Sequence, residues 1–196
     1  MKATELLEAQ HRKVEQLFKR IESGRSDKKA TVRELADALG AHMMIEEEIF
    51  YPAVKKVKED LVMESYEEHD VARYALRNLL GTSVSDERFD ARVTALKELI
   101  EHHVKEEEED LFPKVRKAMA DETQSALGKE MKDAFGGYVD RGFVKLWGSS
   151  PTAHAKPSPS PRPTAATKAF EEQTAKPKRS TKRTSAKTNS RATHAH

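Results

Sequence analysis

The chain has no cysteine among its 196 residues. This absence excludes disulfide bonds, thiolate nucleophiles, iron–sulfur clusters and zinc sites built on thiolates. Any metal ion that the protein binds must therefore be held by histidine, aspartate or glutamate side chains.

Long apolar runs are also missing. No stretch approaches the ~20 apolar residues that a membrane-spanning helix needs, and the opening MKATELLEAQHRK has no apolar signal segment. We therefore expect a cytoplasmic protein. Only 37% of the residues are hydrophobic and 35% are charged, so the core must be compact.

Proline and acidic residues are distributed unevenly. Residues 149–196 hold six of the eight prolines and 10 Lys+Arg against 2 Asp+Glu, whereas residues 1–148 hold 25 against 31. The segment 149–196 has too few apolar side chains to offset its conformational entropy, which predicts a disordered tail after a domain of residues 1–148. Its basic stretch 176–187 predicts either non-specific contact with nucleic acid or a solubilising role.

Apolar residues recur at helical spacing through residues 1–148, and no segment shows the period of a strand. We expect an all-α fold, an antiparallel up-down-up-down four-helix bundle followed by a short C-terminal helix. We expect the first helix to end near Ser23 and Gly24, and the second to begin at a capping box of Thr31 and Glu34. The third helix should cover about 60–81, and the fourth should begin at Ser85 or Asp86. An amphipathic helix is expected over about 122–135, and residues 138–147 are expected to cap one end of the bundle.

Each predicted bundle helix carries one histidine in its apolar stripe. These histidines are His11, His42, His69 and His103. On a helix that turns about 100° per residue, Glu107 lies within about 40° of His103, whereas the adjacent His102 lies about 100° away and faces outward or sideways.

Two of these helices share a longer pattern. The second contains H-x3-E-x5-P from His42 through Glu46, and the fourth repeats it from His103 through Glu107. A single inward histidine is usually a hydrogen-bonded core residue, but four of them with a duplicated H-x3-E favour metal ligation. A buried carboxylate without a partner costs several kcal/mol, and a cation removes that cost.

Four imidazoles and two carboxylates exceed what one tetrahedral zinc ion needs. They suit two adjacent iron ions, or two manganese ions, with the carboxylates bridging the pair and the imidazoles in terminal positions.

The order His, H-x3-E, His, H-x3-E, with the closings EEEIFYP and EEEDLFP, resembles the hemerythrin-like family and its HHE cation-binding domain over about residues 4–118. The resemblance implies a non-haem di-iron centre that reacts with dioxygen or related small oxidants. The family's ligand positions correspond to His11, His42, Glu46, His69, His103 and Glu107.

Two positions depart from the family pattern. Oxygen-carrying members have a second histidine where this chain has Arg73, which weakens the case for a reversible carrier and leaves Arg73 to pair with Glu46 or Glu107 or to reach solvent. The usual acidic residue before the first histidine is Gln10 here, and Glu8 is a candidate to compensate as a supporting group or ligand. Tyr66 is either a hydrogen-bond donor to the centre or a core tyrosine.

Three hypotheses for the function follow from the sequence. The first is a di-iron protein that binds or reacts with dioxygen, hydrogen peroxide or nitric oxide, with peroxide decomposition as its enzymatic form. The second is an iron- or oxygen-sensing module whose folding depends on the metal and whose basic tail tethers it to nucleic acid. The third is a metal-free helical bundle.

Overall fold

The computed structural model describes residues 1–24, 27–148 and Lys168, and the described residues contain no strand. The predicted disorder of the tail and the basic stretch 176–187 lie outside these residues. The helical elements are α1 Ala3–Ser23, α2 Lys28–Ile45, η1 Glu46–Phe50, α3 Tyr51–Val54, α4 Glu59–Leu80, α5 Phe89–Glu106, η2 Glu107–Leu111, α6 Phe112–Ala118, α7 Asp121–Arg141 and α8 Phe143–Trp147, where η denotes a π-helical segment.

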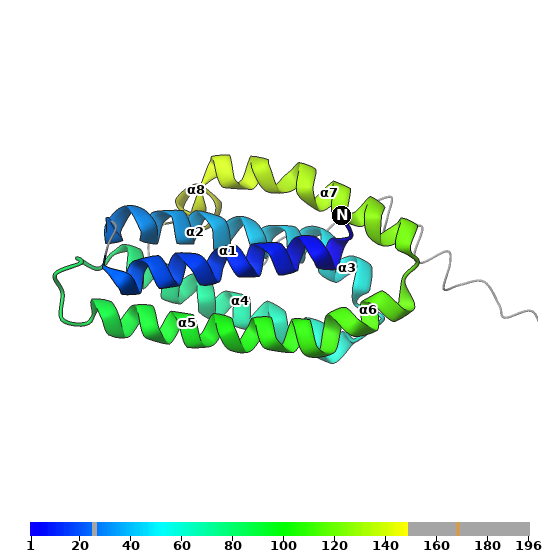
Figure 1. Ribbon diagram of the computed structural model, residues 1–196, viewed down its shortest axis with the longest axis horizontal. Coiled ribbons are helices and arrows are strands. Elements are labelled where there is room, and N and C mark those ends of the chain that lie inside the picture. Colours follow the sequence, from blue (N-terminus) through cyan, green and yellow to red (C-terminus); the bar gives the residue numbers. More distant parts are fainter. Residues whose placement is uncertain (25–26, 149–167, 169–196) are drawn as a thin grey trace, which may run out of the picture.

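Helices α1, α2, α4 and α5 lie side by side as a four-helix bundle (Figure 1). The pairs α1 with α2 and α4 with α5 pack closely. Their antiparallel order confirms the predicted fold class. Among the described helices, none is long and apolar enough to cross a membrane.

Two predicted helix starts are wrong. The N-cap of α2 is Asp27, whose Oδ1 accepts from the amide of Ala30 at 3.1 Å, while Thr31 lies inside the helix. The carboxylate of Glu34 pairs instead with Lys13 and Arg20 of α1. Helix α5 starts at Phe89 because the segment before it forms a turn, in which Asp86 accepts from the amide of Arg88 at 2.9 Å.

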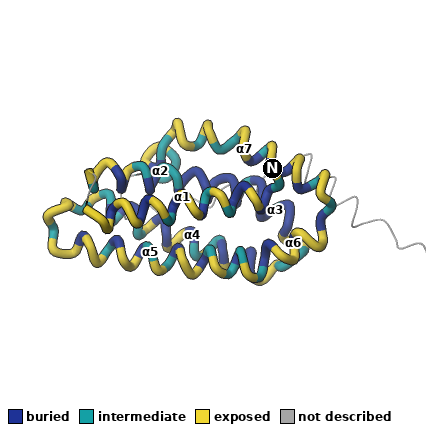
Figure 2. The backbone as a smooth tube through the Cα atoms, in the orientation of Figure 1, coloured by how far each residue is buried: buried dark blue, intermediate teal, exposed yellow. Residues whose placement is uncertain are grey.

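Helix α7 is longer than the sequence predicts, and it forms an additional layer over α1 and α2 with an exposed outer face (Figure 2). Its buried residues include Leu127, Gly128 and Met131. A Cβ on Gly128 would stand 2.5 Å from the carbonyl oxygen of Met1, so glycine lets the N-terminus pass close to the helix. Helix α8 then packs on the side of α2 through Phe143 rather than across an end.

The apolar core is divided in two. One cluster centres on Phe50, Tyr51 and Phe112 near α3 and α6. The other is built from the opposite halves of the bundle helices and includes Phe18 and Leu76. Between the two clusters lies a set of buried polar side chains.

Candidate metal centre

The structure brings all six predicted ligands together in the middle of the bundle. His11 comes from α1 and His69 from α4, while each H-x3-E motif spans the junction between an α-helix and a π-helical segment. The exposed fraction of each ligand residue is 4% or less. His102 points away from this group with a side chain that is 62% exposed, as its helical angle predicts.

The four histidines form two pairs. The Nε2 atoms of His11 and His42 lie 3.2 Å apart, and those of His69 and His103 are also 3.2 Å apart. Each pair joins one histidine from a motif with one that stands alone in its helix. All four Nε2 atoms thus face the interior of the centre.

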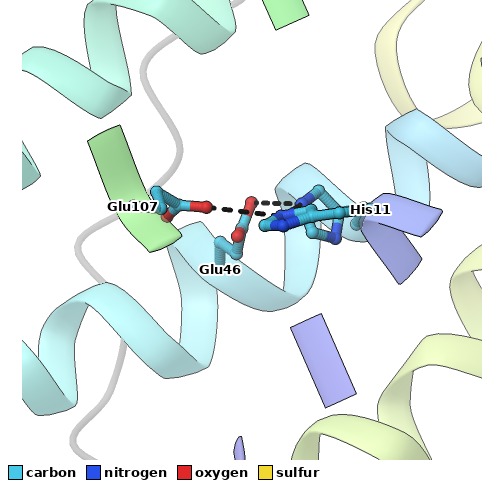
Figure 3. Close-up of side chains that lie close together, drawn as sticks. His11, Glu46 and Glu107 are labelled. Atoms are coloured by element: carbon cyan, nitrogen blue, oxygen red, sulfur yellow. Dashed lines mark hydrogen bonds and ion pairs between the residues drawn. The ribbon is translucent and has the colours of Figure 1, made fainter. Parts of the chain in front are cut away.

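Each carboxylate reaches both histidine pairs. Glu46 Oε2 lies 3.2 Å from His42 Nε2 and 3.4 Å from His69 Nε2. Glu107 Oε2 lies 3.4 Å from His11 Nε2 and 3.7 Å from His103 Nε2. Figure 3 shows Glu107 directed toward the imidazole of His11, with Glu46 close to both. Each carboxylate therefore lies where it could serve a metal ion held by either histidine pair.

The motif glutamates occupy the first residue of each π-helical segment. In the first, the amide of Tyr51 donates to the carbonyl of Glu46, five residues back, and the next residue is Pro52, which has no amide hydrogen. The carbonyl of Glu47 instead accepts from the hydroxyl of Tyr66 at 3.2 Å. Such wide turns are frequent at functional sites, and here one directs a glutamate into the core.

The outer nitrogen of every imidazole also has an acceptor. Nδ1 of His42 faces Gln10 Oε1 at 2.7 Å, and Nδ1 of His103 faces Glu68 Oε2 at 2.7 Å. Because carboxylate and amide oxygens accept a hydrogen bond, each Nδ1 carries the proton and each Nε2 keeps its lone pair for a cation.

The other two acceptors follow the motif glutamates. His11 Nδ1 contacts Glu108 Oε1 at 2.8 Å, and His69 Nδ1 contacts Glu47 Oε1 at 2.9 Å. The acceptors thus stand immediately before each lone histidine or immediately after each motif glutamate. Sequence reasoning missed Glu47, Glu68 and Glu108, although this symmetry of position is visible in the sequence once the ligands are chosen.

Several neighbouring residues differ from their predicted roles. Arg73 pairs with Glu47 at 2.5 Å and with Asp70, and it stacks on Trp147, so it reaches neither Glu46 nor Glu107. Glu8 pairs with Arg116 at 2.9 Å. The tyrosine at the centre is Tyr51, whose hydroxyl donates to Glu107 Oε1 at 2.9 Å and lies 3.3 Å from His69 Nε2.

The two motif glutamates share one negative charge in the metal-free protein. Burial and the neighbouring Glu107 raise the pKa of Glu46 well above its usual value. Burial also opposes ionisation of Glu107, but the neighbouring imidazoles of His103 and His11 outweigh it and lower its pKa. The raised pKa favours the protonated form of Glu46, and the lowered pKa favours the ionised form of Glu107.

Both Glu46 oxygens and Glu107 Oε2 are buried without a hydrogen-bond partner. Orphaned oxygens of this kind are costly unless a cation fills the space between them. His11, His42, Glu46 and Glu107 can each offer an atom to one ion, and Glu46, His69 and His103 to a second. The residues present therefore fit a pair of metal ions.

The metal-free centre should lose stability in mild acid. Burial lowers the pKa of His42 and of His69, so below about pH 6.5 the unfolded chain binds more protons at these residues. Glu46 and His103 act oppositely because their folded pKa values are raised. We expect the free energy of unfolding to fall by about 0.5 kcal/mol from pH 6.5 to 5.5.

Urea unfolding of chelator-treated protein measures this slope. In Glu46→Gln the opposing contribution of Glu46 is gone, and the fall in the free energy of unfolding over this pH unit should increase to about 1.8 kcal/mol. A stability that stays constant or increases toward pH 5.5 in the unmodified protein would contradict the neutral state of the two histidines.

A small cavity of ≈ 10 Å³ adjoins the centre and is lined by the four histidines and by apolar residues that include Leu39 and Met43. This volume admits about one water-sized molecule. A surface groove of ≈ 290 Å³ between α1 and α5 shares His11, Val14, Ile100 and Val104 with the cavity lining. The centre is thus close to the surface on this side.

Comparison with known proteins agrees with this geometry. A family model described as the hemerythrin HHE cation binding domain matches residues 2–115. The crystal structure of a hemerythrin HHE cation binding domain-containing protein from Mycobacterium kansasii is similar with a TM-score of 0.63 and 26% identity, covering 71% of this chain and 88% of that one.

A curated relative, a DNA nickase from Nostoc sp., is 28% identical over 137 residues, which are 68% of this chain and 39% of the relative. The chain therefore spans about two fifths of that protein's length. The family model, by contrast, covers more than half of this chain and includes every residue of the candidate centre. The chain belongs to the hemerythrin HHE cation-binding domain family.

Proposed function

We propose that the chain holds two iron ions and reacts with a small oxidant such as dioxygen, hydrogen peroxide or nitric oxide. One observation carries the proposal, namely two histidine pairs joined by Glu46 and Glu107 beside a cavity of ≈ 10 Å³. When bound, iron would supply electrons and an open position for the oxidant. Manganese suits the same ligands, and elemental analysis separates the two metals.

The protein's own residues would set the orientation of the ligands and the size of the reactant. The acceptors at each Nδ1, three carboxylates and the amide of Gln10, keep the imidazoles turned inward. Tyr51 places a hydroxyl proton between Glu107 and His69. Burial raises the pKa of this hydroxyl well above its usual value, so the proton is retained at neutral pH.

The first experiment is metal analysis of freshly purified protein with optical spectra before and after addition of peroxide. We expect about two irons per chain and a charge-transfer band from the near-ultraviolet to the visible that peroxide changes. Decomposition of peroxide over many turnovers would assign the enzymatic form. Protein that folds with one metal or none and shows no spectral response would reject the proposal.

A sensing role is the second candidate, because the orphaned carboxylate oxygens favour a fold that depends on metal. A sensor would change stability with metal occupancy while consuming peroxide slowly, so the rate of consumption distinguishes the two functions. Nucleic-acid contact through residues 176–187 stays a prediction from the sequence. We do not extend nicking of DNA to this chain, since most of the relative's length has no counterpart in it.

A further inference from the structure

A second group of metal-ligating side chains lies on the surface formed by α4 and α5. It consists of Glu68, His102 and Glu106, whose ligand atoms all lie within 4.8 Å of one another. His102 and Glu106 repeat the His-to-Glu spacing of His103 and Glu107, displaced by one residue along the same helix. The repeat therefore has one copy facing the core and one facing solvent.

The distances in this group are close to those of a coordinated ion. His102 Nε2 lies 3.6 Å from Glu106 Oε1 and 3.8 Å from Glu68 Oε1. Ligands 2.0–2.2 Å from one tetrahedral ion are about 3.4 Å apart, so movements of a few tenths of an ångström would complete the site. The side chain of Glu68 is only 14% exposed, and this carboxylate is already positioned by its other oxygen, which accepts from His103.

The charges of this group are not neutralised by the protein. No lysine or arginine among the described residues pairs with Glu68 or Glu106, whose only ion-pair contacts are with histidines. In addition, Glu106 Oε2 is shielded from solvent and accepts no hydrogen bond. An orphaned carboxylate oxygen next to an available imidazole favours a dication that accepts mixed nitrogen and oxygen ligands.

We propose that Glu68, His102 and Glu106 form a third, solvent-accessible site for a divalent transition-metal ion, completed by water. It is separate from the buried centre, but Glu68 connects the two because its second oxygen holds the imidazole of His103. The same carboxylate would therefore hold both the surface ion and the imidazole of His103 in the buried centre.

The test is equilibrium dialysis of the full chain, stripped of metal, against Zn²⁺ as the probe. At saturation, His102→Ala and Glu106→Gln should each bind one ion fewer per chain than the unmodified protein. Glu101→Gln is the matched control, since Glu101 lies on the same helix with its side chain 58% exposed and should leave the count unchanged. Circular dichroism establishes that each variant keeps its helices.

The test compares the number of Zn²⁺ ions bound per chain by the unmodified protein and by its variants, so it does not depend on how many ions the buried centre binds. Failure of the proposed iron chemistry would therefore leave it intact. Binding curves that superimpose for the unmodified protein and both variants would overturn the third site, as would an equal loss in Glu101→Gln.

Discussion

Replacing His103 with alanine is expected to abolish stable binding of the metal pair, whereas the same change at His102 leaves the pair in place. The two residues are neighbours on α5, yet His103 is 3% exposed and lies 3.2 Å from His69, while the side chain of His102 is 62% exposed. His103→Ala removes one of the two imidazoles that, among the described residues, are placed to hold the second ion. It also leaves Glu68 without its Nδ1 partner.

The measurement is the iron that remains with the protein after passage through a chelating resin, which strips weakly held surface ions. About two irons should remain with His102→Ala and fewer than one with His103→Ala. Helical content by circular dichroism separates loss of ligands from loss of fold. Equal iron contents in the two variants would refute the assignment of the inward histidine.

Metal loading should stabilise the unmodified protein strongly and Glu46→Gln hardly at all. An ion at 100 times its dissociation constant adds about 2.7 kcal/mol to the free energy of unfolding. For a chain of this size such a gain raises Tm by roughly 5–10 °C. Glu46 contacts a histidine of each pair, so its loss weakens both ion sites together.

The same substitution should not destabilise the metal-free protein. Burial and Glu107 favour the protonated form of Glu46, and glutamine has almost the same shape as that form. Glutamine also removes the cost of protonating Glu46 on folding, so we expect the stability without metal at pH 7 to rise by about 1.4 kcal/mol for each pH unit by which folding raises the pKa of Glu46. Thermal unfolding with and without iron measures both quantities, with Glu109→Gln, an exposed change on the other π-helical segment, as the control. A full metal-induced gain in Glu46→Gln would show that this carboxylate does not bridge.

The sequence was sufficient to predict the fold class and to predict that the six candidate ligands lie close together. The reason is physical, because histidine and glutamate four residues apart share a helix face, and a polar pair within an apolar stripe must be turned inward. His102 and His103 could be separated by angle alone. Ligation by these residues remains a prediction that metal analysis tests.

The supporting acceptors could not be predicted in the same way. Regular α-helical angles place Glu108 about 140° from His103, outside the apolar stripe, whereas it lies in a π-helical segment and contacts His11. Tyr51 adjoins a proline after the other π-helical segment. Its position depends on a wide turn that has no strong sequence signal. Long-range contacts such as Glu68 with His103 depend on the register between helices, which one sequence does not give.

In each half of the bundle the motif glutamate contacts a histidine of the other half, so the complete centre forms only when the two halves assemble. The hairpin of α1 and α2 contributes two imidazoles and Glu46 to the buried centre, and that of α4 and α5, extended by η2, contributes two imidazoles and Glu107. Either fragment alone therefore has ligands for a single ion of the buried centre. Glu46 reaches His69 and Glu107 reaches His11 only in the assembled bundle. If the proposed pair of irons is bound, a chain divided between α3 and α4 would therefore regain magnetic coupling between them only when its fragments reassociate, and the strength of that signal would measure the fraction of correctly docked halves.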